Sequence, residues 1–302
     1  MTSPASNGPL HAGELAIQRR YGVAEMGGRV AAMIRPEIAP TARDFLARQP
    51  FATAAVLDRE SRPWAALWSG SAGFLNAVDE KTVRIAFSAL DALTKTRVDW
   101  PGPVGLLALE PATRRRMRLN GRAAIGADGV LELHADEVYG NCPKYIQKRH
   151  LEPVNETPGE TRFGEGPDER QWRWIKSADT FFLATHNPDG GADASHRGGS
   201  PGFVKRRGDR IFEFADYAGN NLFNSLGNLA VNPRLGVTFI DFPTGDVLQL
   251  TGHAELIDRA PDADDFAGSE GRIIRVEVEE WAEQAGAMPW RGEVTEPSPF
   301  NP

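Results

Sequence analysis

The sequence predicts a mainly β protein with short helices (α+β), built from two tandem barrels. Two observations lead there: the chain repeats itself at a period of about one domain, and each copy consists of short strand-like runs separated by Gly, Asp and Pro turns. Regular helices do not alternate with these runs, which favours a barrel over a doubly wound parallel sheet. At 302 residues, the chain is long enough for two ordinary domains.

The repeat is visible at corresponding places in both halves. The strand-like runs at residues 51–58 and 181–185 begin the two copies. Gly73-Phe74 recurs 129 residues later as Gly202-Phe203, and the stretch 117–123 recurs as 248–254, with its glycine 131 residues further on. Two near-identical offsets over a whole domain indicate an internal duplication.

The domain boundaries follow from this pattern. We expect an N-terminal tail and helices at 1–44, a first barrel at 45–150, a linker with a short helix at 151–178, and a second barrel at 179–302. The helical patterning at 12–47 is broken near Pro36 and Pro40. Another helix is expected from Leu222 until Asn232-Pro233, capped by Asn220 or Asn221.

Composition and charge exclude several functions. A net charge of −7 is unfavourable for nucleic-acid binding, and the six histidines are too scattered to form a metal cage. The single cysteine, Cys142, excludes an internal disulfide. No apolar stretch is long enough for a membrane span, and residues 1–10 do not resemble a secretory signal, so we expect a cytoplasmic protein.

A glycine-rich stretch before a strand is the strongest candidate for a binding loop. It contains Ser195, His196, Arg197, Gly198, Gly199 and Ser200. Arg197 offers a rigid donor fork to a phosphate, and the glycines either admit a ligand to the backbone or only turn the chain. A second candidate is the expected helix start, where Asn220, Asn221 and Ser225 either bind an anion or only cap the helix.

Two further segments carry polar groups. Alternation places Gln249 on one face of the strand at 245–251, as it does Arg116 and Arg118 in the first copy, and this face either meets the other barrel or is solvated. The segment 138–147 brings Asn141, Lys144, Tyr145 and Cys142 together. Cys142 is either a reactive thiol or a buried filler.

Together these stretches resemble the pyridoxamine 5'-phosphate oxidase-like FMN-binding split barrels. The resemblance is carried by Arg197-Gly-Gly-Ser-Pro-Gly-Phe203, Gly219-Asn-Asn-Leu-Phe-Asn-Ser225, residues 228–234, Leu248-Gln-Leu-Thr-Gly252 and residues 139–146. It implies two Greek-key split barrels packed as a pseudo-dimer, with FMN between them. The implied cofactor-binding residues are Ser195, His196, Arg197, Gly198, Gly199, Ser200, Asn220, Asn221, Ser225 and Gln249, completed by Asn141, Lys144 and Tyr145.

The chain also departs from the oxidase pattern. The oxidase carries Arg-Lys at the helix start and a lysine at the end of the first-hairpin strand, whereas this chain has Asn, Ser and Ser200 there, so compensation of the phosphate charge is either weaker or comes from elsewhere, with Arg197, Arg116 or Arg118 as candidates. The first copy lacks the Arg and Asn set, which implies one complete site per barrel pair.

The resemblance implies an FMN-dependent oxidoreductase acting on a small molecule with an electron donor or acceptor. The alternatives are a haem-degrading or deazaflavin-dependent enzyme, or a non-catalytic flavin- or haem-binding protein. The sequence assigns no catalytic residue, and a homodimer is left open.

Overall fold

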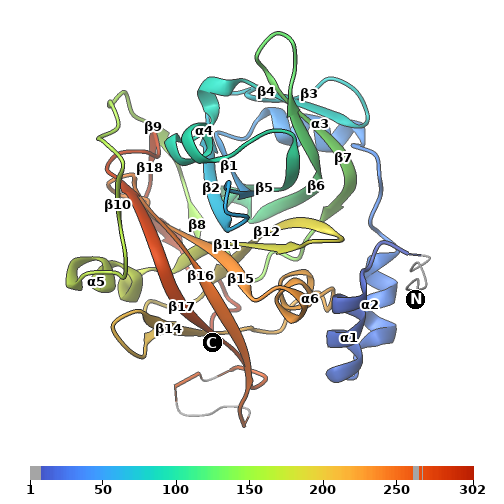
Figure 1. Ribbon diagram of the computed structural model, residues 1–302, viewed down its shortest axis with the longest axis vertical. Helices are drawn as coiled ribbons and strands as arrows, with labels where there is room; N and C mark the ends of the chain where they lie inside the picture. The colour runs from blue at the N-terminus through green and yellow to red at the C-terminus, as the bar shows by residue number, and fades with distance from the viewer. Residues whose placement is uncertain (1–7, 261–264, 267) are drawn as a thin grey trace.

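Two antiparallel sheets of equivalent topology form the molecule. The structure is a computed structural model that describes residues 8–260, 265–266 and 268–302. Figure 1 shows the strands of the first half above those of the second, with α1 and α2 beside α6. The seven-stranded first sheet has the order β2-β1-β5-β6-β7-β4-β3. Its strands are β1 (Phe51–Leu57), β2 (Pro63–Ser69), β3 (Leu75–Ala77), β4 (Thr82–Ile85), β5 (Gly102–Glu110), β6 (Arg115–Ile125) and β7 (Leu131–Gly140).

The second sheet repeats this order as β12-β11-β15-β16-β17-β14-β13, with β10 added at β17. Its strands are β10 (Arg162–Gly164), β11 (Thr180–Asn187), β12 (Gly191–Gly198), β13 (Val204–Arg206), β14 (Ile211–Ala215), β15 (Arg234–Asp241), β16 (Asp246–Asp258) and β17 (Arg272–Gln284). Each strand of the first sheet thus has a counterpart numbered ten higher. The expected mainly β fold with two tandem barrels is confirmed, and the matching orders support the duplication.

The equivalence extends to an irregularity in one strand. The register of β6 with β7 shifts between Asn120 and Gly121, and that of β16 with β17 shifts between Thr251 and Gly252. A Cβ at Gly121 would lie 1.9 Å from the His134 carbonyl oxygen. A Cβ at Gly252 would lie 2.0 Å from the oxygen of Glu277. Both bulges therefore need glycine, which explains why the Asn-Gly and Thr-Gly pairs recur.

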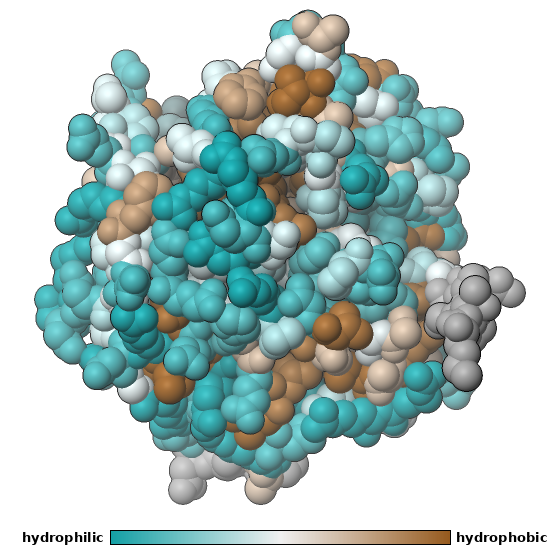
Figure 2. Space-filling view, viewed as in Figure 1, coloured by the Kyte–Doolittle hydropathy of each residue, from teal (hydrophilic) through white to brown (hydrophobic). Residues whose placement is uncertain are grey.

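The three largest apolar clusters of the described residues hold the fold together. One lies inside each unit, and a third joins them through β1, β2 and β5 of the first and β11, β12 and β15 of the second, with Phe51, Leu107, Phe182 and Ile240 among its members. The face in Figure 2 is mostly hydrophilic, with hydrophobic residues in separate patches. The two units therefore pack as the expected pseudo-dimer.

Two equivalent glycines permit the close approach of the units. A Cβ at Gly105 on β5 would lie 2.4 Å from the Ala192 carbonyl oxygen of β12. A Cβ at Gly236 on β15 would lie 2.6 Å from the Pro63 carbonyl oxygen of β2. Strand β5 of the first unit thus packs on β12 of the second, and the equivalent β15 packs on β2. The contact between the units is therefore approximately symmetric.

Helices and short strands complete the fold. The helices are α1 (Ala12–Arg20), α2 (Ala24–Ala31), α3 (Pro40–Ala47), α4 (Ala92–Arg97), α5 (Glu169–Ser177) and α6 (Asn224–Val231). The remaining strands pair as β9 (Glu152–Pro153) with β18 (Trp290–Arg291) and β8 (Lys148–Arg149) with β19 (Val294–Glu296), so the C-terminal segment returns to the stretch between the sheets. None of the described helices has the length and apolar character needed to cross a membrane.

The start of α6 differs from the expectation. The helix begins at Asn224, and the preceding Phe223 has a left-handed backbone (φ 61°) and no side-chain cap. Asn220 and Asn221 therefore do not cap the helix. They lie in the loop before it, where Asn220 Oδ1 accepts a hydrogen bond from the backbone N–H of Leu222 at 3.2 Å. The local Asx contact competes with helix formation, which explains the later start.

Candidate functional site

A polar pocket lies where the two units meet at one end of their contact. It encloses about 770 Å³, its open mouth included. The first unit contributes β6 and the segment after β7, and the second contributes the end of β12, the loop before α6 and the start of α6. The lining consists of Arg116, Arg118, Asn141, Cys142, Lys144, Tyr145, His196, Arg197, Gly198, Phe203, Ala215, Asp216, Tyr217, Gly219, Asn220, Asn221, Phe223, Asn224 and Ser225.

Three arginines make this pocket cationic in a chain of net negative charge. Arg116 and Arg118 alternate on β6, so both side chains leave the same face of the strand, and Arg197 comes from β12 of the other unit. Burial lowers the pKa of Arg116 to about 9, helped by the charges of Arg118 and Arg197. Within the described lining, Asp216 is the only carboxylate. The arrangement favours an anion, which would offset the mutual repulsion of the guanidiniums.

Arg118 is held by hydrogen bonds from the second unit. Its Nη2 donates to Ser195 Oγ at 2.6 Å, and its Nη1 donates to Asn224 Oδ1 at 3.2 Å. The Ser195 and Ser225 hydroxyl oxygens are 2.8 Å apart, so β12, α6 and β6 are joined in one buried chain of polar contacts. The guanidinium is therefore fixed at the contact of the two units.

Several buried polar atoms around the pocket have no hydrogen-bond partner in the described part of the chain. They are the Nε atoms of Arg116, Arg118 and Arg197, Oδ1 of Asn141 and Nε2 of His196. Buried polar groups are rarely left without partners, since each costs about 1–3 kcal/mol. Their gathering at one pocket indicates a binding site for a polar ligand.

Arg197 is more integral to the fold than a residue of a surface loop. It lies on β12, not in a loop, and is partly buried beside Asp216, with 3.3 Å between its Nη2 and Asp216 Oδ1. Asp216 Oδ2 also accepts from Nε of Arg272 at 3.1 Å. The expected place of Arg197 in a binding loop is wrong, because the strand continues as far as Gly198.

His196 is buried next to Arg116. Its Nδ1 lies 3.4 Å from Arg116 Nη1. Desolvation, followed by the charges of Arg116 and Arg197, lowers the pKa of His196 well below its usual value, so the ring is neutral at physiological pH.

Aromatic side chains form the other wall of the pocket. The rings of Tyr145 and Tyr217 are 5.4 Å apart, and the Tyr145 hydroxyl donates to the Ala218 carbonyl oxygen at 3.1 Å. Phe223 lines the same region, and both it and Asn221 adopt left-handed backbone conformations. The pocket thus has a cationic end and an aromatic wall.

Nine of the proposed cofactor-binding residues line this pocket: His196, Arg197, Gly198, Asn220, Asn221, Ser225, Asn141, Lys144 and Tyr145. Ser195 lies behind it and bonds Arg118 and Ser225. Cys142 is half-buried in the lining and is therefore not a buried filler.

The glycines of the expected binding loop serve packing. A Cβ at Gly198 would lie 2.0 Å from the Tyr145 carbonyl oxygen, and one at Gly199 would lie 2.8 Å from the Phe203 side chain. Protein atoms thus occupy the space that a side chain would take at these two positions. Gly199 is outside the pocket lining, as is Ser200, which is exposed.

Gln249 lies apart from the arginine pocket. Its Nε2 donates to the Ala65 carbonyl oxygen at 3.1 Å and to Asp91 Oδ2 at 2.9 Å, across the contact with the first unit. The expected interface position is confirmed, whereas its assignment to the same pocket as Arg197 is wrong. The polar strand residues that line the pocket with Arg197 come from the other barrel and are Arg116 and Arg118.

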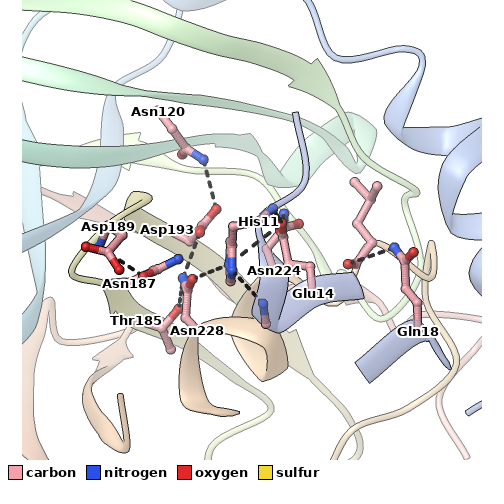
Figure 3. Close-up of polar contacts among 12 residues, drawn as sticks. His11, Glu14, Gln18, Asn120, Thr185, Asn187, Asp189, Asp193, Asn224 and Asn228 are labelled. Atoms are coloured by element: carbon pink, nitrogen blue, oxygen red, sulfur yellow. Dashed lines mark hydrogen bonds and ion pairs between the residues drawn. The ribbon is translucent and has the colours of Figure 1, made fainter. Parts of the chain in front are cut away.

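The N-terminal helix α1 also reaches this region, which no sequence pattern predicts. Figure 3 shows His11 and Glu14 beside Asn224 and Asn228 of α6, next to Asp193 and Asn120. His11 Nε2 lies 2.9 Å from Asn228 Oδ1, and Asn228 Nδ2 donates to Asp193 Oδ2 at 2.8 Å. No local pattern marks the polar residues of α1, because only the tertiary fold buries them.

The fold and the pocket define a two-barrel protein whose polar site is built by both units. The comparison with family models agrees with the fold of the second unit. Residues 168–287 match the family described as pyridoxamine 5'-phosphate oxidase. The second unit is therefore a pyridoxamine 5'-phosphate oxidase-like split barrel, as the sequence resemblance predicts. The sequence matches no curated protein.

Solved structures resemble single parts of the chain. A protein described as a putative pyridoxamine 5'-phosphate oxidase from Lactobacillus delbrueckii is 15% identical, with a TM-score of 0.31 and coverage of 38% of this chain and 93% of its own. HutZ, the haem storage protein from Vibrio cholerae, is 15% identical, with a TM-score of 0.29 and coverage of 39% and 93%. The HupZ protein of Group A Streptococcus is 10% identical, with a TM-score of 0.31 and coverage of 44% and 98%. Likenesses this weak carry no argument about ligand or activity.

Proposed function

We propose that the chain binds one FMN in the pocket between its units and acts as a flavin-dependent oxidoreductase on a small molecule. The observation that supports this most is the set of unpartnered buried guanidinium Nε atoms of Arg116, Arg118 and Arg197 around one cavity. A phosphate carries negative charge and several acceptor oxygens, so it suits this donor set.

The other parts of the pocket suit a planar ring. Tyr145, Tyr217 and Phe223 offer apolar surface next to the cationic end, and Asn141 and Asn220 offer amide groups that can bond ring carbonyl and N–H groups. A ligand with a phosphate at one end and an aromatic ring at the other matches this division, and the family to which the second barrel belongs agrees with it.

The protein's own contribution is binding and orientation. Bound FMN would supply the redox chemistry. The three arginines would hold its phosphate, and the tyrosines and amides would orient the ring beside the open mouth, where a small-molecule substrate and an electron donor or acceptor can enter. We assign no proton-transferring residue.

A specific observation favours haem as a second candidate. His196 is neutral and buried, its Nε2 has no partner in the described part of the chain, and it lines the same pocket as the arginines. A neutral imidazole nitrogen is a common ligand of haem iron, and arginines can pair with the propionates.

The absorption spectrum of the protein, purified with its bound ligand, tests the proposal. FMN gives the two visible bands of an oxidised flavin, which bleach on reduction, and mass analysis of the released ligand identifies FMN. A haem Soret band that is lost in His196→Ala would replace the proposal with the second candidate. A colourless protein that binds neither added FMN nor haem would refute both. Reoxidation of the reduced flavin by a substrate distinguishes an enzyme from a carrier.

A further inference from the structure

The carboxylate of Glu14, on the N-terminal helix, is buried against the start of α6. Glu14 is 3% exposed. Its Oε2 accepts the backbone N–H of His11 at 2.8 Å, and its Oε1 accepts from Asn224 Nδ2. Both oxygens act as acceptors in these contacts, as they do in the ionised form of the carboxyl, which predominates above its pKa of about 8.

These contacts fix the direction of the Asn224 amide. Because Nδ2 of Asn224 donates to Glu14, its Oδ1 is turned toward Arg118, whose Nη1 donates to it at 3.2 Å. A flipped amide would place an N–H donor against the guanidinium, which has donors only. The carboxylate of α1 thus determines whether Asn224 can accept from Arg118.

From this geometry we infer that Glu14 is a positioning residue of the pocket, which acts through Asn224 to hold the Arg118 guanidinium against the bound anion. The inference rests on the proposed function, since the anion is the phosphate of FMN. The N-terminal helix would then contribute Glu14 to a site whose other residues come from the two split barrels.

A second contact of α1 supports the inference. Gln18 is fully buried, and its Nε2 donates to the carbonyl oxygens of Asn221 at 3.0 Å and Leu222 at 3.3 Å. Figure 3 shows Gln18 and Glu14 on the side of α1 that faces α6. The loop with the left-handed Asn221 and Phe223 is therefore held by the same helix.

Charged groups from every neighbouring element act on Glu14. Asp193 of β12 and Glu137 of β7 repel its ionised form, and the His11 ring lies 3.6 Å away. Arg118 of β6 bonds Asn224 and lies 3.7 Å from Asp193, so it brings a positive charge to the same cluster. Desolvation is the largest effect and, with Asp193, raises the pKa of Glu14 to about 8. The role of the ionised Glu14 carboxylate is therefore tested at a pH above about 8.

The experiment is an FMN titration at about pH 9, where Glu14 is ionised. Glu14→Ala removes both acceptor oxygens and should weaken FMN binding about tenfold, the effect of losing one hydrogen bond to a charged group. The matched control is Glu25→Ala on α2, which removes an exposed carboxylate paired with Arg29 and should leave the affinity unchanged.

A rescue distinguishes positioning from a general loss of structure. In the double variant Glu14→Gln with Asn224→Asp, the glutamine amide can donate to one aspartate oxygen while the other accepts from Arg118. This variant should bind FMN within about threefold of the wild type. Wild-type affinity in Glu14→Ala, or a double variant as weak as Glu14→Ala, would overturn the inference.

Urea unfolding of the flavin-free variants separates the two proposals. If the wild type does not bind FMN, the proposed function fails, and the unfolding measurements alone then test the Glu14–Asn224–Arg118 contact. The single variants Glu14→Gln and Asn224→Asp should each lose this contact, and the double variant should be more stable than the sum of their two effects predicts. Additive effects of the two substitutions would refute the contact itself.

Discussion

Arg118 and Gln249 hold equivalent positions on β6 and β16, two residues before the bulge, yet they face different pockets. Arg118 bonds Ser195 and Asn224, whereas Gln249 bonds the Ala65 carbonyl oxygen and Asp91. The approximate two-fold relation of the units sends each strand's polar residue to the opposite side of the contact. One side thus collects guanidiniums, while on the other the buried carboxylate of Asp91 accepts the available donors.

This asymmetry predicts opposite effects of two matched substitutions. Arg118→Ala should weaken FMN binding about tenfold to a hundredfold, because it removes a charged hydrogen-bond donor. Gln249→Ala should leave FMN affinity unchanged but lower the free energy of unfolding by about 1–3 kcal/mol, since Asp91 and Ala65 lose a buried donor. Flavin fluorescence titration and urea unfolding of both variants check this. Equal losses of affinity would contradict the assignment of the two pockets.

Arg197 should affect both binding and stability. Arg197→Ala removes a donor from the pocket and leaves Asp216 with Arg272 as its remaining partner. We expect FMN binding to weaken about tenfold to a hundredfold, and the flavin-free protein to lose about 1–3 kcal/mol of unfolding free energy. Arg197→Lys should recover only part of the affinity, because a point charge lacks the planar fork. Full affinity in Arg197→Ala would remove this residue from the site.

The buried carboxyls predict a stability that falls as pH rises. Desolvation raises the pKa of Glu14 to about 8 and that of Glu137 to about 7. Each folded group holds its proton at a pH where the unfolded group, at about 4.5, has lost it. Their contribution is therefore complete below about pH 4.5 and is lost as pH rises through about 7–8.

Urea unfolding at several pH values measures this loss. Between about pH 4.5 and 8, the titration of Glu14 should lower the free energy of unfolding by about 1 kcal/mol per pH unit. Glu14→Gln should flatten the profile, and the exposed control Glu25→Gln should not. A wild-type slope in Glu14→Gln would show that Glu14 titrates normally.

The close contact of the units predicts a sharp difference between two glycines of β5. A Cβ at Gly105 would meet backbone atoms of Ala192 and Asp193 below 3 Å, whereas the nearest atom to a Cβ at Gly102 is 3.5 Å away. Gly105→Ala should lower the free energy of unfolding by about 1–3 kcal/mol or more, and Gly102→Ala should change it little. Urea denaturation of both variants measures the effect. Equal stabilities would contradict the tight packing of β5 on β12.

The repeat in the sequence was sufficient to predict two equivalent barrels. Gly121 and Gly252 recur because both bulges require them, and residues such as Leu119 and Leu250 recur because both face a core. Local sequence encodes these features, since they depend on strand alternation and backbone sterics.

The parts of the site that could not be predicted depend on tertiary contacts. Nothing in the sequence tells whether Gln249 faces Arg197 or the opposite pocket, because the relative placement of two similar units decides it. The sequence around Gly198 predicts a glycine that admits a ligand. In the fold, the Tyr145 carbonyl oxygen lies against this glycine instead. Glu14 is more than 200 residues from Asn224 along the chain, so their contact leaves no local pattern.

We propose a single anion-binding flavin site that is built by both units of one chain. Its most direct test is a titration of the ligand-stripped protein with FMN, in which flavin fluorescence is followed to saturation alongside Arg118→Ala. We predict saturation at one FMN per chain for the wild type and a strongly weakened curve for the variant. Saturation at two per chain, or binding that does not depend on Arg118, would contradict the account.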